Sequence, residues 1–142
     1  MSTYYKKVLV PLDGSSNASQ ACHHAVSLAK CCDMEIVLLY CYGDLPAAIG
    51  GEAREDIIRL SEEEGRAILE PCKKHCEENG VACKTIIRSG GPGRTIVLTS
   101  QAEGCDLVIM GSRGLSDFTG MVMGSVSHRV LRHSTVPVLM VR

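Results

Sequence analysis

Three glycines and a serine that follow an apolar run have a spacing that suits phosphate chemistry. Gly111 and Gly114 are separated by two residues, and nine more residues lead to Gly124 and Ser125. Glycine lets a ligand come close to backbone amides, and unpaired amides at the start of a helix attract anions. Because a helical pattern begins at Ser125, this spacing predicts a phosphate cradle between an apolar strand and a helix.

Two neighbouring side chains add polar groups to the predicted cradle. Arg113 brings a positive charge, and Ser127 brings a hydroxyl group like that of Ser125. Each glycine taken singly also fits a role in a turn or in close helix–sheet packing, and Arg113 also fits a solvated loop charge. Gly120 is expected to form a turn in the connecting loop.

Two other phosphate-binding patterns are missing. GxGxxG is absent from the first strand–helix turn, which argues against a dinucleotide-dependent dehydrogenase. GxxxxGK[ST] is absent as well, and the glycine segment contains no lysine to reach terminal phosphates. The predicted cradle is therefore neither a dehydrogenase turn nor a P-loop.

Cysteine and histidine are concentrated in two short motifs. In CKKHC, Cys72 and Cys76 are one helical turn apart with His75 between them, and in ACHHA, Cys22 stands beside His23. The spacing of zinc sites is missing, because no CxxC pair occurs. The eight cysteines are Cys22, Cys31, Cys32, Cys41, Cys72, Cys76, Cys83 and Cys105.

A simpler role for the cysteines is packing. Free cysteine is a small and often buried hydrophobe. Cys22 and Cys32 fall in step with Ala18, Ala25 and Ala29 on one helical face. We therefore expect neither a structural metal site nor disulfides in this chain.

The elements that must position these residues alternate along the chain. Apolar runs typical of buried strands lie at 7–12, 35–42, 81–90, 105–111 and 136–142, and helical patterns stand between them. Strands that alternate with helices predict right-handed crossovers and a parallel sheet covered on both faces. The fold class is therefore α/β: one domain over 1–142, a Rossmann-like three-layer sandwich around a five-stranded parallel sheet.

Two details of this pattern are specific enough to test. The run at 81–90 is more polar than the others, which places it nearer an edge of the sheet. The long helical pattern from Glu52 to Asn79 contains Pro71, which predicts a kink or a second helix start near Glu70.

Composition excludes several classes of function. The chain has 142 residues, 45% of them hydrophobic, and a net charge of -1. This balance gives no electrostatic footprint for nucleic acid or a membrane surface. No apolar run approaches the ~18 residues of a transmembrane helix, and no signal peptide is visible. We expect a cytoplasmic protein without nucleic-acid or membrane partners.

The sequence resembles the universal stress protein family. The resemblance rests on the Gly–x2–Gly–x9–Gly–Ser spacing and on three flanking blocks, KVLVPLDGS, CDLVIMGSRG and GSVSHRVLRHSTVPVLMVR, in the same order as in the family. It implies an adenine nucleotide α-hydrolase-like fold and ATP, ADP or AMP as ligand, with Mg²⁺ or Mn²⁺ carried on the phosphates. It also implies a homodimer through Val136–Arg142, a strand whose apolar edge invites pairing.

The resemblance implies a role for each residue of the site. Asp13 would bind the ribose, although a turn or N-cap role fits it too, and the backbone of Cys41 would meet the adenine edge. The whole implied binding set is Pro11, Leu12, Asp13, Cys41, Met110, Gly111, Arg113, Gly114, Gly124, Ser125, Val126 and Ser127. No catalytic residue and no protein ligand for a metal is assigned.

Three functions follow from these patterns. The first is an ATP-binding stress or signalling module with at most slow hydrolysis. The second is an enzyme that hydrolyses ATP or acts as an ATP pyrophosphatase, but the loop PLDGSSNAS has one glycine and an aspartate where such an enzyme needs phosphate donors. The third is a dimerisation or docking module that binds no nucleotide.

Overall fold

The computed structural model describes residues 5–114 and 123–142, and in them strands and helices alternate as the sequence predicts. All strand pairings are parallel. The elements are β1 (Lys7–Pro11), α1 (Ser16–Cys32), β2 (Glu35–Tyr42), α2 (Gly51–Glu78), β3 (Cys83–Ser89), α3 (Pro92–Ala102), β4 (Leu107–Gly111), α4 (Ser125–His133) and β5 (Val138–Val141). The α/β fold class is confirmed.

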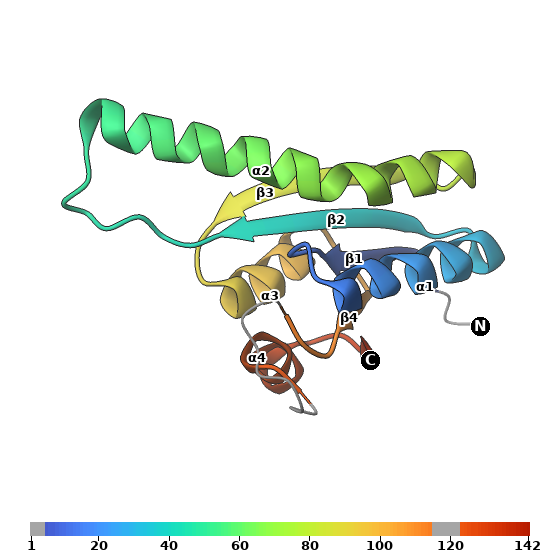
Figure 1. The fold of residues 1–142 in the computed structure, drawn as a ribbon. Helices are drawn as coiled ribbons and strands as arrows, with labels where there is room; N and C mark the ends of the chain where they lie inside the picture. Colours follow the sequence, from blue (N-terminus) through green and yellow to red (C-terminus); the bar gives the residue numbers. More distant parts are fainter. Residues whose placement is uncertain (1–4, 115–122) are drawn as a thin grey trace.

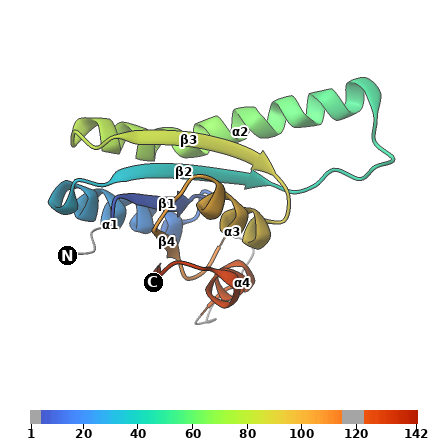
Figure 2. The same cartoon turned by 180° about the vertical axis from the view of Figure 1, so that it is seen from behind.

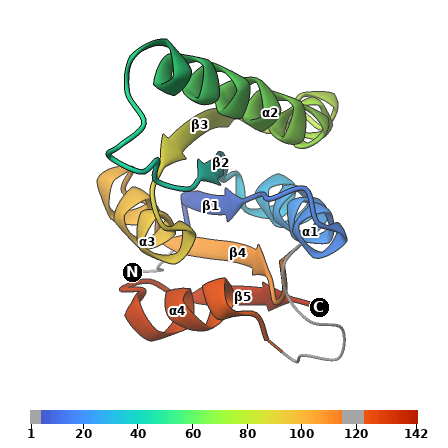
Figure 3. The ribbon, with the colours of Figure 1, turned by 60° about the vertical axis from the view of Figure 1, so that its left-hand side comes forward.

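The strands lie in the order β3-β2-β1-β4-β5, so the order reverses between β1 and β4. The polar run at Cys83–Ser89 is an edge strand, as expected, and β5 forms the other edge. Figure 1 and Figure 3 show α1 and α2 on one face of the sheet, and Figure 2 shows α3 and α4 on the other. These three layers are the predicted sandwich.

Side-chain alternation along the strands divides the core in two. Val8 and Val10 of β1 face α1 and α2, whereas Leu9 faces α3 and α4. All three are fully buried, because a central parallel strand has a helix layer on each side. β1, β2 and β4 therefore contribute core residues on both faces of the sheet, and the candidate site residues lie at the ends of these strands.

The first helix has a clear beginning and end. Ser15 precedes it in an extended conformation, and its hydroxyl oxygen accepts a hydrogen bond from the Ala18 amide at 3.2 Å. This is the N-cap geometry that satisfies one of the free amides of a helix start. Asp33 closes the helix in the left-handed region at φ 55°, and its amide donates to the Ala29 carbonyl.

The long helix α2 is continuous through Pro71. Of the two outcomes predicted near Glu70, a kink or a second helix start, the second start is therefore wrong. Pro71 lies inside the helix. Proline removes one backbone hydrogen bond, that to the carbonyl of Ala67. Both residues are exposed, so water reaches the carbonyl that loses its partner. The buried residues of α2 all lie from Gly65 onward, and its first half extends past the sheet (Figure 1).

One expectation about the cysteines is wrong as well. Cys22 of α1 and Cys72 of α2 form a disulfide, with Cα atoms 6.1 Å apart. Sequence spacing did not indicate it, because the partners are separated by 50 positions and meet only when the two helices pack side by side. The packing role predicted for Cys32 is also wrong, since its side chain is exposed at the end of α1.

Within residues 5–114 and 123–142, none of the helices has the length and apolar character needed to cross a membrane.

Candidate functional site

A pocket lies at the carboxyl ends of β1, β2 and β4, where the strand order reverses. Open parallel sheets bind ligands in this crevice. The pocket has a volume of about 250 Å³. Its lining residues are Pro11, Leu12, Asp13, Ser15, Ala18, Leu39, Cys41, Pro92, Ile96, Met110, Gly111, Arg113, Gly114, Val126 and Ser127. The structure therefore brings together every residue of the predicted binding set except Gly124 and Ser125, which are not part of this lining.

The loop after β1 is held by its own hydrogen bonds. The Asp13 carboxylate accepts a hydrogen bond from the Ser15 amide at 2.9 Å, as in an Asx turn. Gly14 between them has φ 88°, a conformation that a side chain would strain. The turn role considered for Asp13 is thus present in the structure, and it fixes the carboxylate at the edge of the pocket.

The start of α4 lies at the same pocket, because Val126 and Ser127 line it. Gly124 is its N-cap residue, and its amide donates to the Ser112 carbonyl at 2.6 Å. The first bond within the helix runs from the His128 amide to the Gly124 carbonyl at 3.0 Å. The amides of Ser125, Val126 and Ser127 precede that bond, and amides in this position carry the positive end of the helix dipole. Gly124 therefore contributes to the site as the N-cap residue of α4 and does not line the pocket itself.

Ser127 has a different role from the one predicted for its hydroxyl group. The side chain is buried, and its hydroxyl donates to the Gly111 carbonyl at 2.8 Å. A hydroxyl has one proton to donate, so this bond uses the proton that a phosphate oxygen would need. Through this bond Ser127 connects α4 to the end of β4.

Gly111 is needed for packing between β4 and α1. A Cβ atom built on Gly111 would lie 2.7 Å from Asn17 Cβ and 2.9 Å from the Asn17 carbonyl carbon. A contact this close with backbone cannot be relieved by a side-chain rotation. The simpler role in close helix–sheet packing is therefore present at Gly111. Gly120 lies outside the described residues.

The side chain of Cys41 lines the pocket. Burial raises the pKa of this thiol to about 11, and the nearby Arg88 guanidinium opposes the shift only in part. Since the thiolate is the nucleophilic form, Cys41 is a neutral thiol at physiological pH. It contributes polarizable surface to the pocket and no reactive group.

We expect Cys41 to react slowly with iodoacetamide at pH 7.5. Its raised pKa leaves almost no thiolate, whereas Cys31 is exposed on α1 and serves as the internal control. Peptide mapping by mass spectrometry at timed intervals should show Cys31 labelled well before Cys41. Equal labelling rates at the two positions would contradict the burial of Cys41.

Five lining residues were not predicted from the sequence. Ser15 and Ala18 belong to the start of α1, Leu39 lies on β2, and Pro92 and Ile96 come from α3. For Pro92 the signal was available, because it follows a strand end on the same edge of the sheet. The other four look like ordinary cap and core residues, and only the packed structure places them at the pocket.

Comparisons with known proteins identify the family to which this chain belongs. The model of the Universal stress protein family matches residues 4–142. The universal stress protein MJ0531 of Methanocaldococcus jannaschii is 36% identical over 141 residues, which is 97% of this chain and 82% of the relative. The chain belongs to the universal stress protein family.

Solved structures of this family share the fold. The structure of the hypothetical protein MJ0577, of Methanocaldococcus jannaschii, superposes with a TM-score of 0.89 at 32% identity, over 98% of this chain and 96% of that one. A universal stress protein family protein of Arabidopsis thaliana, solved with AMP bound, has a TM-score of 0.71 at 24% identity and covers 96% of this chain and 90% of that one. At that lower identity the likeness is one of fold. The Rossmann-like α/β sandwich is thus the universal stress protein fold.

Proposed function

We propose that this chain binds ATP, with ADP and AMP as related occupants, and acts as a nucleotide-responsive module with at most slow hydrolysis. The observation that carries the proposal is one pocket that combines an apolar inner wall with the amino end of α4. Apolar walls suit a nucleobase, and helix amides suit phosphate oxygens. AMP in the related Arabidopsis protein supports the same ligand class.

The pocket offers a separate surface to each part of the nucleotide. Leu39, Ile96 and Met110 form the apolar wall for the adenine ring. The fixed carboxylate of Asp13 stands where a ribose hydroxyl would donate to it. Val126 and Gly114 line the phosphate end, at the start of α4 and after β4. Three kinds of surface in one cavity favour a nucleoside phosphate over a free phosphate ion.

A divalent ion would fit this pocket when it is coordinated mainly by the phosphates of the nucleotide. Mg²⁺ and Mn²⁺ prefer carboxylate and other oxygen ligands. Across residues 5–114 and 123–142 no group of three or more metal-ligating side chains comes together. Among the described residues that line the pocket, Asp13 is the one with a carboxylate. Phosphate oxygens would therefore supply most of the ligands, and the ion would neutralise their charge.

The lining residues support binding more than designed catalysis. The residues with ionisable side chains among them are Asp13, Cys41 and Arg113. Asp13 is engaged by the loop amide of Ser15, and Cys41 is held as a neutral thiol. A hydrolytic enzyme needs a nucleophile or water-activating base placed beside the scissile phosphate. This composition favours a nucleotide sensor over an ATP-hydrolysing enzyme.

The proposal is tested by nucleotide identity and by turnover. The purified protein is denatured, released nucleotide is identified by chromatography, and ATP, ADP and AMP are titrated with Mg²⁺ by calorimetry. We expect bound adenine nucleotide or saturable heat, and turnover well below about 1 s⁻¹, the lower end of ordinary enzyme rates. No bound nucleotide together with no heat would exclude the binding function. Turnover above that rate would favour the enzyme.

We also propose that the chain forms a homodimer through β5. This strand is an edge of the sheet and carries Leu139, whose side chain is 41% exposed. Val138 and Met140 beside it are only half-buried. In the part of the chain that the structure describes, no strand pairs with the outer edge of β5. An apolar edge strand is a template for pairing with another chain. A second copy of β5, related by a two-fold axis, would form hydrogen bonds with the unpaired backbone groups of that edge.

Leu139→Lys is expected to convert the dimer into a monomer at micromolar concentration. A lysine at this edge places a charge in the paired surface, a device that natural edge strands use against association. Sedimentation velocity gives the mass directly. Leu60→Lys is the matched control, because Leu60 is 55% exposed but lies on the first half of α2, away from β5. A wild-type monomer, or a dimer that survives Leu139→Lys, would contradict the proposed interface.

A further inference from the structure

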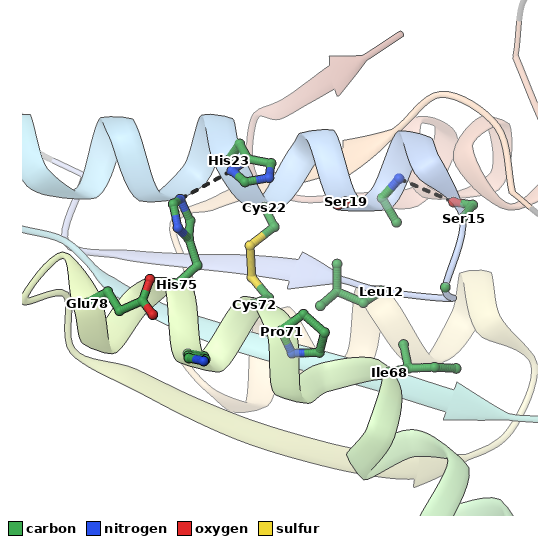
Figure 4. A pocket seen from close by; sticks show the side chains of 13 residues that line it. Leu12, Ser15, Ser19, Cys22, His23, Ile68, Pro71, Cys72, His75 and Glu78 are labelled. Atoms are coloured by element: carbon green, nitrogen blue, oxygen red, sulfur yellow. Dashed lines mark hydrogen bonds between the residues drawn. A yellow bond between two sulfur atoms is a disulfide. The ribbon is translucent and has the colours of Figure 1, made fainter.

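A second cavity lies between α1 and α2 and has the disulfide in its wall. Its volume is about 400 Å³, within the range of small-molecule pockets, roughly 300–1,000 Å³. Cys22 and Cys72 both line it, although their side chains are otherwise buried at 3% and 5% exposure. Figure 4 shows the bond between the two helices, with Leu12, Ile68 and Pro71 toward one end. Both cysteines of the disulfide therefore contact the groove.

The same groove holds a pair of imidazoles. His23 Nδ1 and His75 Nε2 are 3.2 Å apart, and the two rings meet edge to face. His23 follows Cys22 in ACHHA, and His75 lies one turn after Cys72 in CKKHC, so packing of α1 on α2 joins the two motifs (Figure 4). An imidazole pair beside a disulfide provides a proton donor for a departing thiolate.

The polar side chains of the groove offer hydrogen-bond donors to an anionic molecule. Among the described residues, Lys74 and the two imidazoles line the groove together with one carboxylate, Glu78. Outside the groove, Lys30 of α1 donates to the Asn79 side chain at 3.1 Å, which links the two helices there. Side chains that can donate a hydrogen bond therefore outnumber carboxylates in the described lining of the groove.

We propose that the Cys22–Cys72 bond is a thiol–disulfide exchange site, and that its co-reactant is a low-molecular-weight thiol bearing carboxylates, seated in this groove. Lys74 would attract the carboxylates, and the groove would guide the thiol to the sulfur of Cys72. A disulfide with a purely structural role requires neither an adjacent groove nor an imidazole pair, and both are present here. This groove is a different cavity from the proposed nucleotide pocket, although Leu12, Ser15 and Ala18 line both, and the proposal does not depend on the proposed function.

The exchange proceeds in two balanced steps. The external thiolate attacks the sulfur of Cys72, which forms a mixed disulfide and releases Cys22 as a thiolate that takes a proton from the His23–His75 pair. A second external thiol then attacks the sulfur of the external group in the mixed disulfide, which leaves Cys72 as a thiol. Two external thiols lose two electrons and become one external disulfide, while the two cysteines gain those electrons. The reverse sequence reoxidises the protein.

The test uses the full chain with Cys31 and Cys32, both exposed, replaced by serine so that they do not react. A chelator is kept in every sample, because thiolates released by reduction bind trace zinc. The protein is oxidised with glutathione disulfide and then reduced with glutathione. Loss of the linked Cys22–Cys72 peptide is followed by mass spectrometry. We expect a rate that saturates with glutathione concentration, as binding in a groove requires.

Three variants separate an exchange site from a structural bond. His23→Gln combined with His75→Gln should slow the reduction by at least about tenfold, since a positioned proton donor is lost. His24→Gln is the matched control, because His24 is an exposed neighbour on α1, and it should leave the rate unchanged. Lys74→Gln should slow reduction by glutathione while leaving reduction by uncharged 2-mercaptoethanol unchanged. Far-UV circular dichroism checks the fold of each variant.

Three results would overturn the proposal. One is the absence of a Cys22–Cys72 linked peptide after oxidation. Another is a rate that rises linearly with glutathione, without saturation. The third is a rate that the paired histidine substitution leaves unchanged in a variant with a native circular dichroism spectrum.

Discussion

Replacing Val126 by glutamate should raise the Kd for ATP by about a hundredfold, a loss of roughly 2.8 kcal/mol of binding free energy. Val126 lines the pocket and is the second residue of α4. A carboxylate there would stand against the phosphates, and two like charges about 4 Å apart repel by several kcal/mol near a protein surface. Calorimetric titration with ATP and Mg²⁺ measures the change.

The same substitution should leave the fold intact. A glutamate in the first turn of a helix interacts favourably with the helix dipole, so α4 should be no less stable. Val126→Gln is the matched control, with the same shape and no charge, and it should weaken ATP binding far less. Adenosine has no phosphate, so its affinity should be equal for the two variants. If ATP binds Val126→Glu as tightly as Val126→Gln, the phosphates do not lie at the start of α4.

Gly111→Ala should lower the free energy of unfolding by about 2–3 kcal/mol, the upper part of the range for overpacked cores. The added methyl group would collide with Asn17 at the start of α1, including its backbone carbon at 2.9 Å. Relief requires α1 to move away from β4, and the nucleotide pocket between them would change with it. Urea unfolding followed by circular dichroism gives the free energy, and calorimetry gives the ATP affinity.

Gly43→Ala is the control for this experiment. A Cβ atom placed on Gly43 would have no heavy atom within 4 Å, and its φ is not positive, so an alanine fits there without strain. Its stability should stay within about 0.5 kcal/mol of the wild type or rise slightly. Equal stability of the two variants would show that α1 accommodates a side chain at position 111.

The sequence predicted the elements well because each one carries its own local signal. Strands such as Glu35–Tyr42 are continuous apolar runs, and the polar composition of Cys83–Ser89 identified it as an edge strand. Pro71 led to the prediction of a second helix start that α2 does not have. The free-energy cost of a proline inside a helix depends on whether the carbonyl that it leaves unpaired is exposed to solvent. That depends on the environment of Ala67, which the local sequence does not contain.

The family resemblance assigned Asp13, Cys41 and Met110 to the site, and the structure places all three in one pocket, at the ends of three neighbouring strands. The disulfide and the imidazole pair were not predictable, since they join residues that are about 50 positions apart. The sequence showed both cysteine–histidine motifs but gave no reason for them to meet. Only the packing of α1 against α2 brings ACHHA and CKKHC together.

The two cavities share a wall, because Leu12, Ser15 and Ala18 line both. Any factor by which reduction of the Cys22–Cys72 bond changes the affinity for nucleotide must be the same factor by which bound nucleotide changes the reduction equilibrium. The start of α1 is the element common to the two sites. If both proposed sites are active, this element would couple the thiol balance of the cell to its adenine nucleotides.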